Sequence, residues 1–241
     1  MSSTALTIRY IAYGLYFASF VYAVVLSIPV LTNRSGKSVS KTGGGAEGSL
    51  SDLMSSISQW ADTADEYEGS PGQSKRIAEL ARQIGERYGL PADELDALEC
   101  AALLHDVGQI NNFDFINEAR PLTFDEKTRM EEHPILGEQL VKQIADIGSA
   151  ALWVRWHHER WDGCGYPDQL SGEMIPLPVR ILSVADTYDA LTHKRPYRNA
   201  MSTENAVKEL QKMAGIMFDP NVIQVFMSID AESEIGSSLE V

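Results

Sequence analysis

The sequence predicts an all-α domain behind an N-terminal membrane anchor, and three observations support this fold class. From residue 49 onward, apolar residues recur at steps of three and four, which is the spacing of the buried face of a helix. No segment shows the strict alternation of apolar and polar residues that is typical of a half-buried strand. Residues 10–32 contain no charged side chain and are rich in Leu, Ile, Val, Phe and Tyr.

Residues 10–32 are long enough to cross a bilayer, because 23 residues span about 35 Å as a helix. A cleaved signal peptide is the alternative, but the run is long for one and no small-x-small cleavage site follows it. Arg9 precedes the run, whereas Arg34, Lys37 and Lys41 follow it. This excess of basic residues favours a cytoplasmic C-terminal side. We therefore expect a single-pass protein of the inner (cytoplasmic) membrane, with its catalytic domain in the cytoplasm.

The rest of the chain divides into three segments. Residues 33–48 are rich in Gly, Ser and Lys and are predicted to be a linker. Residues 49–230 are predicted to form one folded domain, and residues 231–241 form an acidic tail. A helix near residues 50–66 is a hypothetical homodimer contact, on the basis of its position next to the linker alone.

The helices of the domain are predicted from apolar periodicity and from end signals. Gln73–Tyr88 keeps its apolar residues on one face. Ala92–Val107 stops at Gly108, which suits a C-terminal cap. Thr123–Glu126 is a capping box and marks the start of another helix. Further helices are expected near residues 134–146, 148–158, 178–193, 202–214 and 219–228.

The charge and the cysteine content exclude some classes of protein. The formal net charge of −14 argues against binding of a DNA or RNA polymer, which requires clustered Lys and Arg. Cys100 and Cys164 are too few and too far apart for a disulfide framework. We interpret Cys100 as a small core residue and Cys164 as the variable position of a glycine turn.

Four of the five histidines lie among acidic residues, at positions suited to a shared metal centre. His157 and His158 are adjacent, and a lone His133 lies upstream. His105 falls on the apolar face of its helix, with Asp106 at the edge of that face. A hydrogen-bonded core histidine is the alternative reading of His105. Because a buried carboxylate is costly unless it is paired or bound to a metal, Asp106 favours a ligand role.

Three further acidic residues have two readings each. Asp186 lies within a helix that is apolar on nearly all sides, so its carboxylate needs a cation. That cation is either a metal ion or the side chain of Arg180 or Arg195. Glu159 and Asp162 are either acceptors that orient imidazoles or simple solvated charges.

The adjacent imidazoles bear on the number of metal ions. On a regular helix the side chains of His157 and His158 diverge by about 100°, so they bind one ion easily only if the helix ends there. Two ions, each bound by one imidazole, are the more natural arrangement, with the two oxygens of Asp106 as a bridge. Mixed His and carboxylate ligands suit iron, manganese, zinc or nickel. Paired-metal sites of this kind serve hydrolysis at phosphorus.

These residues resemble the HD-GYP family, a bacterial branch of the HD-domain metal phosphohydrolases, over about residues 50–230. The run at 157–167, HHERWDGCGYP, is close to the full family signature and includes the loop residues Gly163, Gly165 and Pro167. The stretches at 104–108, 180–186 and 195–198 stand in the expected order and spacing.

The resemblance implies an all-helical HD-type bundle with a C-terminal GYP extension, and hydrolysis of the second messenger cyclic di-GMP. It implies a centre of divalent metal ions, often iron or manganese, and we expect two of them here. The implied metal ligands are His105, Asp106, His133, His157, His158 and Asp186, with His105 and Asp106 as the catalytic pair. The implied contacts to the nucleotide and its phosphates are Tyr166, Arg195 and Arg198, and position 109, held by Gln109, also faces the substrate.

The sequence departs from the family pattern at three positions. Gln73 stands where the family usually has a ligand histidine, and Gly69 stands where some members have a ligand glutamate. Gln109 replaces the lysine that normally follows the His-Asp-x-Gly motif. Loss of a charge-assisted contact to phosphate typically costs about 1.5–3 kcal/mol, so these changes predict a weakened or altered activity.

Three functional hypotheses follow from the motifs and from these departures. The leading one is a membrane-anchored, metal-dependent cyclic di-GMP phosphodiesterase. The second is a receptor or interaction module that binds the dinucleotide with little or no catalysis, as Gln73 and Gln109 suggest. The third is a phosphohydrolase that acts on another nucleotide.

Overall fold

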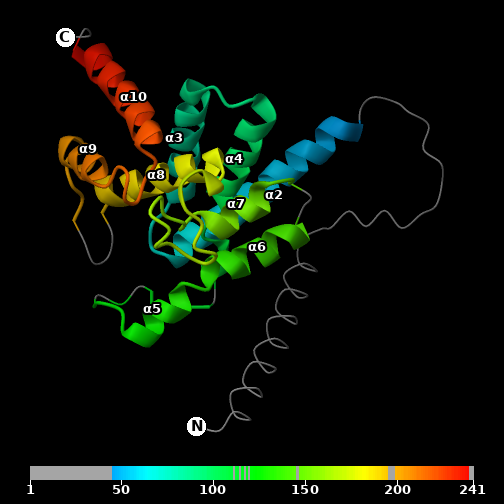
Figure 1. Ribbon diagram of the computed structural model, residues 1–241. Coiled ribbons are helices and arrows are strands. Elements are labelled where there is room, and N and C mark those ends of the chain that lie inside the picture. The colour runs from blue at the N-terminus through cyan, green and yellow to red at the C-terminus, as the bar shows by residue number, and fades with distance from the viewer. Residues whose placement is uncertain are drawn as a thin grey trace, which may run out of the picture. The chain divides into compact units, whose positions relative to one another are not determined.

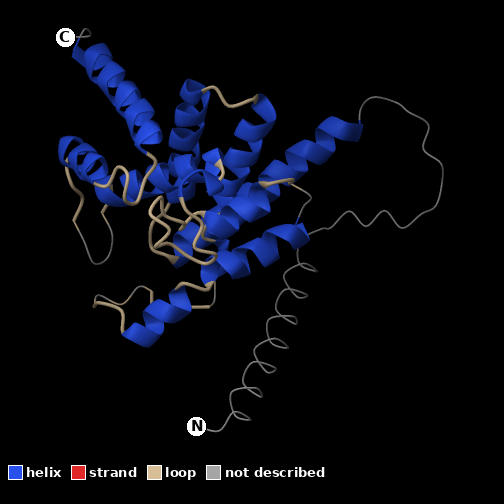
Figure 2. Cartoon of the chain, viewed as in Figure 1, coloured by secondary structure: helices blue, strands red, loops and turns tan. Residues whose placement is uncertain are grey.

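The computed structural model describes residues 45–110, 112–113, 115–116, 118, 120–144, 147–194 and 199–238. Within these ranges every regular element is a helix, which confirms the predicted all-α class (Figure 1, Figure 2). The predicted anchor at 10–32, and Arg195 and Arg198, lie outside the described residues. Among the residues that the structure does describe, no helix combines the length and the apolar character that a membrane span requires.

The domain begins with three helices that carry the first part of the core. α2 (Gly45–Tyr67) starts within the range that was expected to be linker, and α3 (Gln73–Tyr88) has the predicted bounds. Asp65 of α2 caps α3 from a distance, because its carboxylate accepts hydrogen bonds from the backbone N–H of Ser74 and, at 2.6 Å, from its hydroxyl. α3 then packs against α4 (Ala92–Leu104). The buried side chains of this layer include Ile77, Ala81, Ile84, Leu98, Ala102 and Leu104.

The end of α4 differs from the prediction, and Gly108 is not its cap. The helix ends at Leu104, and Gly108 lies in a separate 3-10 helix, η1 (Val107–Gln109). A Cβ added at Gly108 would lie 2.1 Å from the carbonyl oxygen of His133 and 2.6 Å from the nitrogen of Gly137. Only a glycine permits this close approach of two backbones. The glycine therefore brings the segment after α4 against the helix that carries His133.

α5 (Phe124–Met130) begins with the predicted capping box. The backbone N–H of Glu126 donates to the hydroxyl of Thr123, and the Glu126 carboxylate accepts from the backbone N–H of Thr123 at 2.8 Å. All of α5 is described, and none of its residues is buried. It projects at one edge of the domain, away from α9 and α10 (Figure 1). α6 (His133–Ile144) and α7 (Ala150–Trp156) follow.

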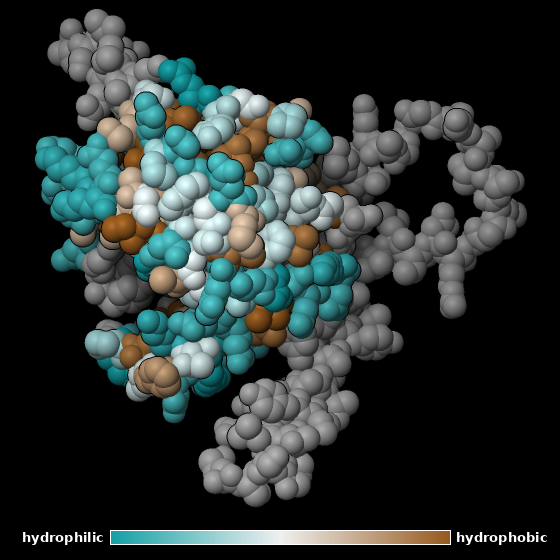
Figure 3. Space-filling model, viewed as in Figure 1, coloured by the Kyte–Doolittle hydropathy of each residue, from teal (hydrophilic) through white to brown (hydrophobic). Residues whose placement is uncertain are grey.

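The C-terminal part consists of three longer helices and one short one. They are η2 (Gly172–Met174), α8 (Leu177–Thr192), α9 (Thr203–Lys212) and α10 (Pro220–Ser238). An isolated bridge joins Ala214 and Phe218 in the turn before α10. The face of the domain shown in Figure 3 is largely hydrophilic with scattered apolar residues, as expected when the apolar faces of the helices point inward.

α8 is less enclosed than predicted around Asp186. The side chain of Asp186 is 19% exposed, whereas Asp189, one turn further on, is 4% exposed. Asp189 is neutralised by Arg76 of α3, whose Nε lies 2.7 Å from its carboxylate. Arg180 pairs with buried Asp219 at 2.5 Å. The fully buried carboxylate of α8 is thus Asp189, and its cation is the side chain of Arg76.

Candidate metal centre

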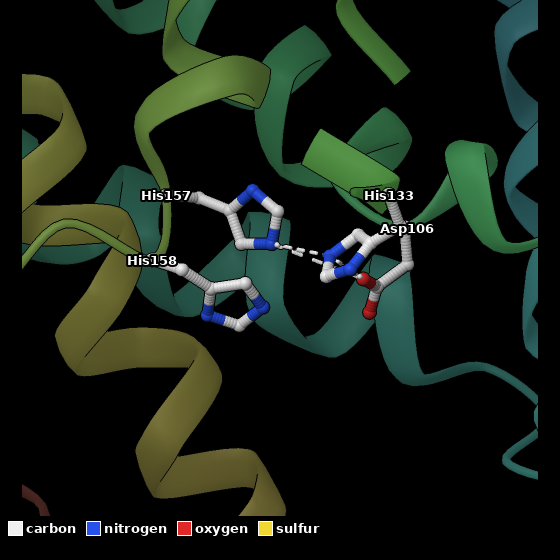
Figure 4. Close-up of side chains that lie close together, drawn as sticks. All are labelled: Asp106, His133, His157 and His158. Carbon is white, nitrogen blue, oxygen red and sulfur yellow. Dashed lines mark hydrogen bonds and ion pairs between the residues drawn. The ribbon is translucent and has the colours of Figure 1, made fainter. Parts of the chain in front are cut away.

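Four side chains from distant parts of the chain meet inside the domain (Figure 4). One ligand atom of each residue lies within 4.8 Å of those of the others, and the residues are Asp106, His133, His157 and His158. Asp106 precedes η1, His133 is the first residue of α6, and His157 and His158 follow the last residue of α7. The cluster is therefore built at helix ends, where the chain changes direction.

Three imidazoles are oriented by the same hydrogen bond. Each places its Nδ1 next to the carbonyl oxygen three residues earlier in the chain. The pairs are His105 with Ala102 (2.8 Å), His133 with Met130 (2.7 Å) and His157 with Val154 (2.6 Å). Because a carbonyl oxygen only accepts, Nδ1 carries a proton, and in the neutral ring Nε2 keeps its lone pair. Metal-binding histidines are commonly held in this way.

Two of these lone pairs face one another. The Nε2 atoms of His133 and His157 lie 3.3 Å apart, and both residues are buried. Burial, followed by the neighbouring imidazoles His133 and His105, lowers the pKa of His157 to about 3, so this ring is neutral near pH 7. Two facing acceptors repel unless a cation lies between them. The donor set of this structure therefore fits a divalent metal ion.

Asp106 divides the centre into two sides. Its Oδ1 lies 3.2 Å from Nε2 of His133 and 3.8 Å from Nε2 of His157, and together with His158 we call this the Oδ1 side. Its Oδ2 lies 2.7 Å from Nε2 of His105, which in turn lies 3.9 Å from Oδ1 of Asp186. We call His105 and Asp186 the Oδ2 side. The arrangement is compatible with a carboxylate that bridges two ions.

The contact between His105 and Asp106 is close but is not a well-formed hydrogen bond. Nε2 of His105 is buried and lacks a hydrogen-bond partner of suitable geometry among the described residues, although Oδ2 of Asp106 is only 2.7 Å away. Burial opposes the charged form of His105, but the negative charge of Asp106 outweighs burial and raises the pKa of His105 to about 10. Without metal, the pair holds a proton that a cation would displace.

His158 joins the same cluster because α7 ends before it. The helix stops at Trp156, so both imidazoles reach one cluster, whereas the sequence favoured an arrangement with one of them on each of two ions. The ring of His158 lies 4.0 Å from that of His157 and 4.9 Å from that of Tyr166, between ring centroids. Burial and the neighbouring imidazoles hold the pKa of His158 well below its usual value, so its nitrogen is available as a ligand. Burial raises the pKa of Tyr166, which keeps its hydroxyl protonated.

Glu159 and Asp162 bind other partners than imidazoles, so the reading as imidazole-orienting acceptors was wrong, and for Glu159, which is buried, the reading as a solvated charge was wrong too. Glu159 is buried, and its carboxylate accepts hydrogen bonds from the backbone N–H groups of Asp168 (2.7 Å) and Leu170 (3.0 Å). Burial raises the pKa of Glu159. Asp162 pairs with Arg160 at 2.6 Å. Both carboxylates organise the loop that carries Tyr166 and leave the imidazoles to backbone carbonyls.

The loop is also held by contacts that the sequence did not suggest. Arg155 and the indole N–H of Trp156 both donate to the carboxylate of Asp168, at 2.7 Å. A Cβ added at Gly165 would lie 2.6 Å from the carbonyl oxygen of His158, so a glycine is required for the loop to approach that residue. The spacing of these residues carries no periodic signal, which is why the contacts of Arg155 and Trp156 with Asp168 were not predicted from the sequence.

The two glutamines at the departures from the family pattern are both buried. The Nε2 of Gln109 donates to Oδ1 of Asp106 at 2.6 Å. The prediction of a substrate-facing position did not include this contact with a residue of the centre. Oε1 of Gln73 is buried and has no hydrogen-bond partner among the described residues. A buried, unpartnered amide oxygen is costly, and it lies at the position where the family resemblance leads to the expectation of a histidine.

Comparisons with known proteins agree with the geometry. The HD domain family profile matches residues 61–222. The chain is similar to the cyclic di-GMP phosphodiesterase response regulator RpfG of Xanthomonas campestris, with 38% identity over 169 residues, 69% of this chain and 45% of that protein. A cyclic di-GMP phosphodiesterase of Thermotoga maritima is 32% identical over 164 residues, 66% of this chain and 44% of that protein.

The fold is similar to that of a solved structure. A cyclic GMP-AMP specific phosphodiesterase of Vibrio cholerae (V-cGAP3) superposes with a TM-score of 0.63 and 22% identity, over 78% of this chain and 51% of that chain. At this identity the likeness shows the fold alone. The chain spans less than half the length of the two curated relatives described above.

Proposed function

Since the chain belongs to the HD domain family, we propose that it is a metal-dependent phosphodiesterase of the HD-GYP branch that hydrolyses cyclic di-GMP. The observation that carries the proposal is the pair of facing lone pairs on His133 and His157, beside a carboxylate at 3.2 Å. A divalent cation would satisfy all of these groups together, whereas a single proton serves two of them at a time. The names of the curated relatives support the choice of substrate.

The residues of the centre have separate tasks. His133, His157 and His158 would hold one divalent ion, and His105 and Asp186 would hold a second, with Asp106 between them. Divalent ions bound there would polarise the phosphodiester and make water more acidic. Iron or manganese suits this mixture of imidazole and carboxylate donors.

The loop after α7 places an aromatic ring over the edge of the centre. Tyr166 packs on His158, and Glu159 and Asp168 hold the loop in place from behind. The tyrosine ring and its protonated hydroxyl are suited to contact a nucleotide bound at the ions. Arg195 and Arg198, which lie outside the described residues, remain predicted phosphate contacts by motif position.

The test uses the full chain in detergent micelles, loaded with manganese or with reduced iron. We expect conversion of cyclic di-GMP to the linear dinucleotide or to GMP, detected by chromatography. His157→Ala is the inactive control, because it removes one of the two facing imidazoles that would bind the metal ion. Bound metal in the wild-type protein without turnover would reject the proposal.

A second function is favoured by the glutamines. Gln109 places a neutral amide on Asp106 where the family has a lysine, and Gln73 is neutral as well. Loss of the lysine and of the ligand histidine would weaken catalysis and leave the pocket formed, as expected of a protein that binds the dinucleotide without hydrolysis. Calorimetric binding of cyclic di-GMP without turnover would indicate a receptor. Hydrolysis of 3′3′-cyclic GMP-AMP in place of cyclic di-GMP would indicate a phosphohydrolase of another nucleotide.

We also propose that residues 10–32 anchor the protein in the inner membrane, with the helical domain in the cytoplasm. The apolar run and the basic residues after it support this proposal. Fractionation of cells that express the full chain should place it with the membranes, and removal of residues 1–32 should release it. Recovery of the full chain in the soluble fraction would contradict it. A homodimer through the region near 50–66 is a further proposal. Light scattering should give a dimer for the helical domain and a monomer for the same domain without residues 49–66, and monomers for both would contradict it.

A further inference from the structure

Gln109 lies where it can act on the metal centre without being a ligand. It is 6% exposed and sits in η1, three residues after Asp106. Its Nε2 donates to Oδ1 of Asp106 at 2.6 Å, the shortest contact that this oxygen makes within the centre. The opposite orientation of the amide would place Oε1 against Oδ1. Two acceptors at that distance repel, so the donor must face the carboxylate.

The oxygen that Gln109 contacts is the one that faces the imidazoles of the Oδ1 side. Oδ1 has two lone pairs, and the amide occupies one of them. The other remains directed toward His133 and His157. A carboxylate held by a neutral donor keeps its full negative charge and loses rotational freedom. Both effects favour a cation at the Oδ1 side.

A lysine at this position would act differently on the same oxygen. Its ammonium group would also donate to Oδ1 but would bring a positive charge beside the bound cation. Like charges in a buried site repel strongly, since the effective dielectric constant there is low. The neutral amide therefore favours metal binding, whereas it gives up a fixed charge that could attract phosphate.

We propose that Gln109 is a positioning residue that fixes Asp106 for the cation of the Oδ1 side and strengthens metal binding there. The inference deepens the proposed function, but it requires only that the centre binds a divalent cation. Loss of a hydrogen-bond partner behind a metal ligand typically costs about 10–100-fold in metal affinity. The expected effect of losing the amide donor is of that size.

The experiment measures manganese binding to the full chain by calorimetry, with competition against a chelator. Gln109→Met keeps the length of the side chain and removes the donor, and we expect about 10–100-fold weaker binding of one manganese ion. Gln109→Lys keeps a donor and adds a charge, and we expect binding at least as weak. The matched control is Gln143→Met, the same replacement at an exposed position of α6, which should bind like wild type.

Cobalt absorption spectra provide a second readout, because the visible bands report the coordination of the ion directly. Gln109→Met should change these bands, and Gln143→Met should not. Wild-type affinity in both Gln109 variants would overturn the inference. If Gln109→Met fails to fold, as judged by circular dichroism, Gln109→Leu, which also removes the donor without adding a charge, replaces it in the test. If wild type binds manganese but shows no turnover, the proposed function fails and the role of Gln109 is still tested.

Discussion

The two oxygens of Asp106 face two differently equipped sets of side chains. On the Oδ1 side, three imidazoles and the carboxylate gather within 4.8 Å of one another. On the Oδ2 side, His105 is at 2.7 Å, and Asp186 approaches His105 only at 3.9 Å from a position that is 19% exposed. The Oδ1 side thus gathers its four ligands at helix ends, three of them buried, whereas on the Oδ2 side a half-buried Asp186 stands further from the imidazole.

The largest effect is expected from Asp106→Asn, because this residue serves both sides. The amide lacks the negative charge that a bridging ligand must provide, so both ions should bind weakly and the rate should fall about 10³-fold. Metal content by mass spectrometry of the native protein and kcat/KM for cyclic di-GMP measure the two outcomes. Asp125→Asn, an exposed residue of α5, is the control. Full metal content in Asp106→Asn would contradict the bridging role.

A comparison of single ligands should separate the two sides. His157→Ala removes a buried ligand of the Oδ1 side, and Asp186→Ala removes a half-buried ligand of the Oδ2 side. We expect His157→Ala to lose the tightly bound ion, and Asp186→Ala to retain it and to lose the weaker one. Titration with manganese, followed by electron paramagnetic resonance, counts the remaining sites. Equal losses in the two variants would show that the sides are not independent.

Gln73→His should strengthen the weaker side. The replacement puts an imidazole at a buried position whose amide oxygen has no hydrogen-bond partner among the described residues. We expect about tenfold tighter binding of the second manganese ion, at the lower end of the effects known for groups around a metal. Calorimetry measures this change. Unaltered binding would show that position 73 does not reach the centre.

The metal-free protein should lose stability as pH rises. The pKa of His105 is about 10 in the folded chain and about 6.5 when unfolded, so its pairing with Asp106 stabilises the fold fully below pH 6.5. That contribution is lost progressively between about pH 6.5 and 10. Urea unfolding in the presence of a chelator should show a falling midpoint across this window. The same series with manganese should be flatter, and identical slopes would contradict the proton–metal exchange.

The smallest effect on metal binding is expected from Glu159→Gln. The amide can accept from the backbone N–H groups of Asp168 and Leu170 with one oxygen only, which leaves one buried donor unsatisfied and costs about 1–3 kcal/mol of folding stability. The Tyr166 loop should become mobile, so KM for the dinucleotide should rise while manganese affinity stays at the wild-type value. A parallel loss of metal would mean that the loop supports the ions as well as the substrate.

Local signals in the chain were sufficient for the helices and for the identity of the cluster. The bounds of α3 and the capping box at Thr123 depend on periodicity and on hydrogen bonds between near neighbours, which a sequence displays directly. The histidines were recognisable because imidazoles beside carboxylates have few uses in a helical core. Because His157 and His158 are adjacent, the sequence also indicated that they could share an ion only if the helix ended before them.

Contacts between distant segments decided the rest. The sequence suggests that Gly108 is a helix cap, but a glycine is needed there because the backbone of His133 lies too close for a side chain. Asp189 rather than Asp186 is the fully buried carboxylate of α8, because Arg76 from another helix reaches it. Glu159 holds a loop, and Gln109 holds Asp106, through hydrogen bonds whose partners no spacing rule identifies. Periodicity determines which face of a helix turns inward, whereas only tertiary packing determines which polar groups meet there.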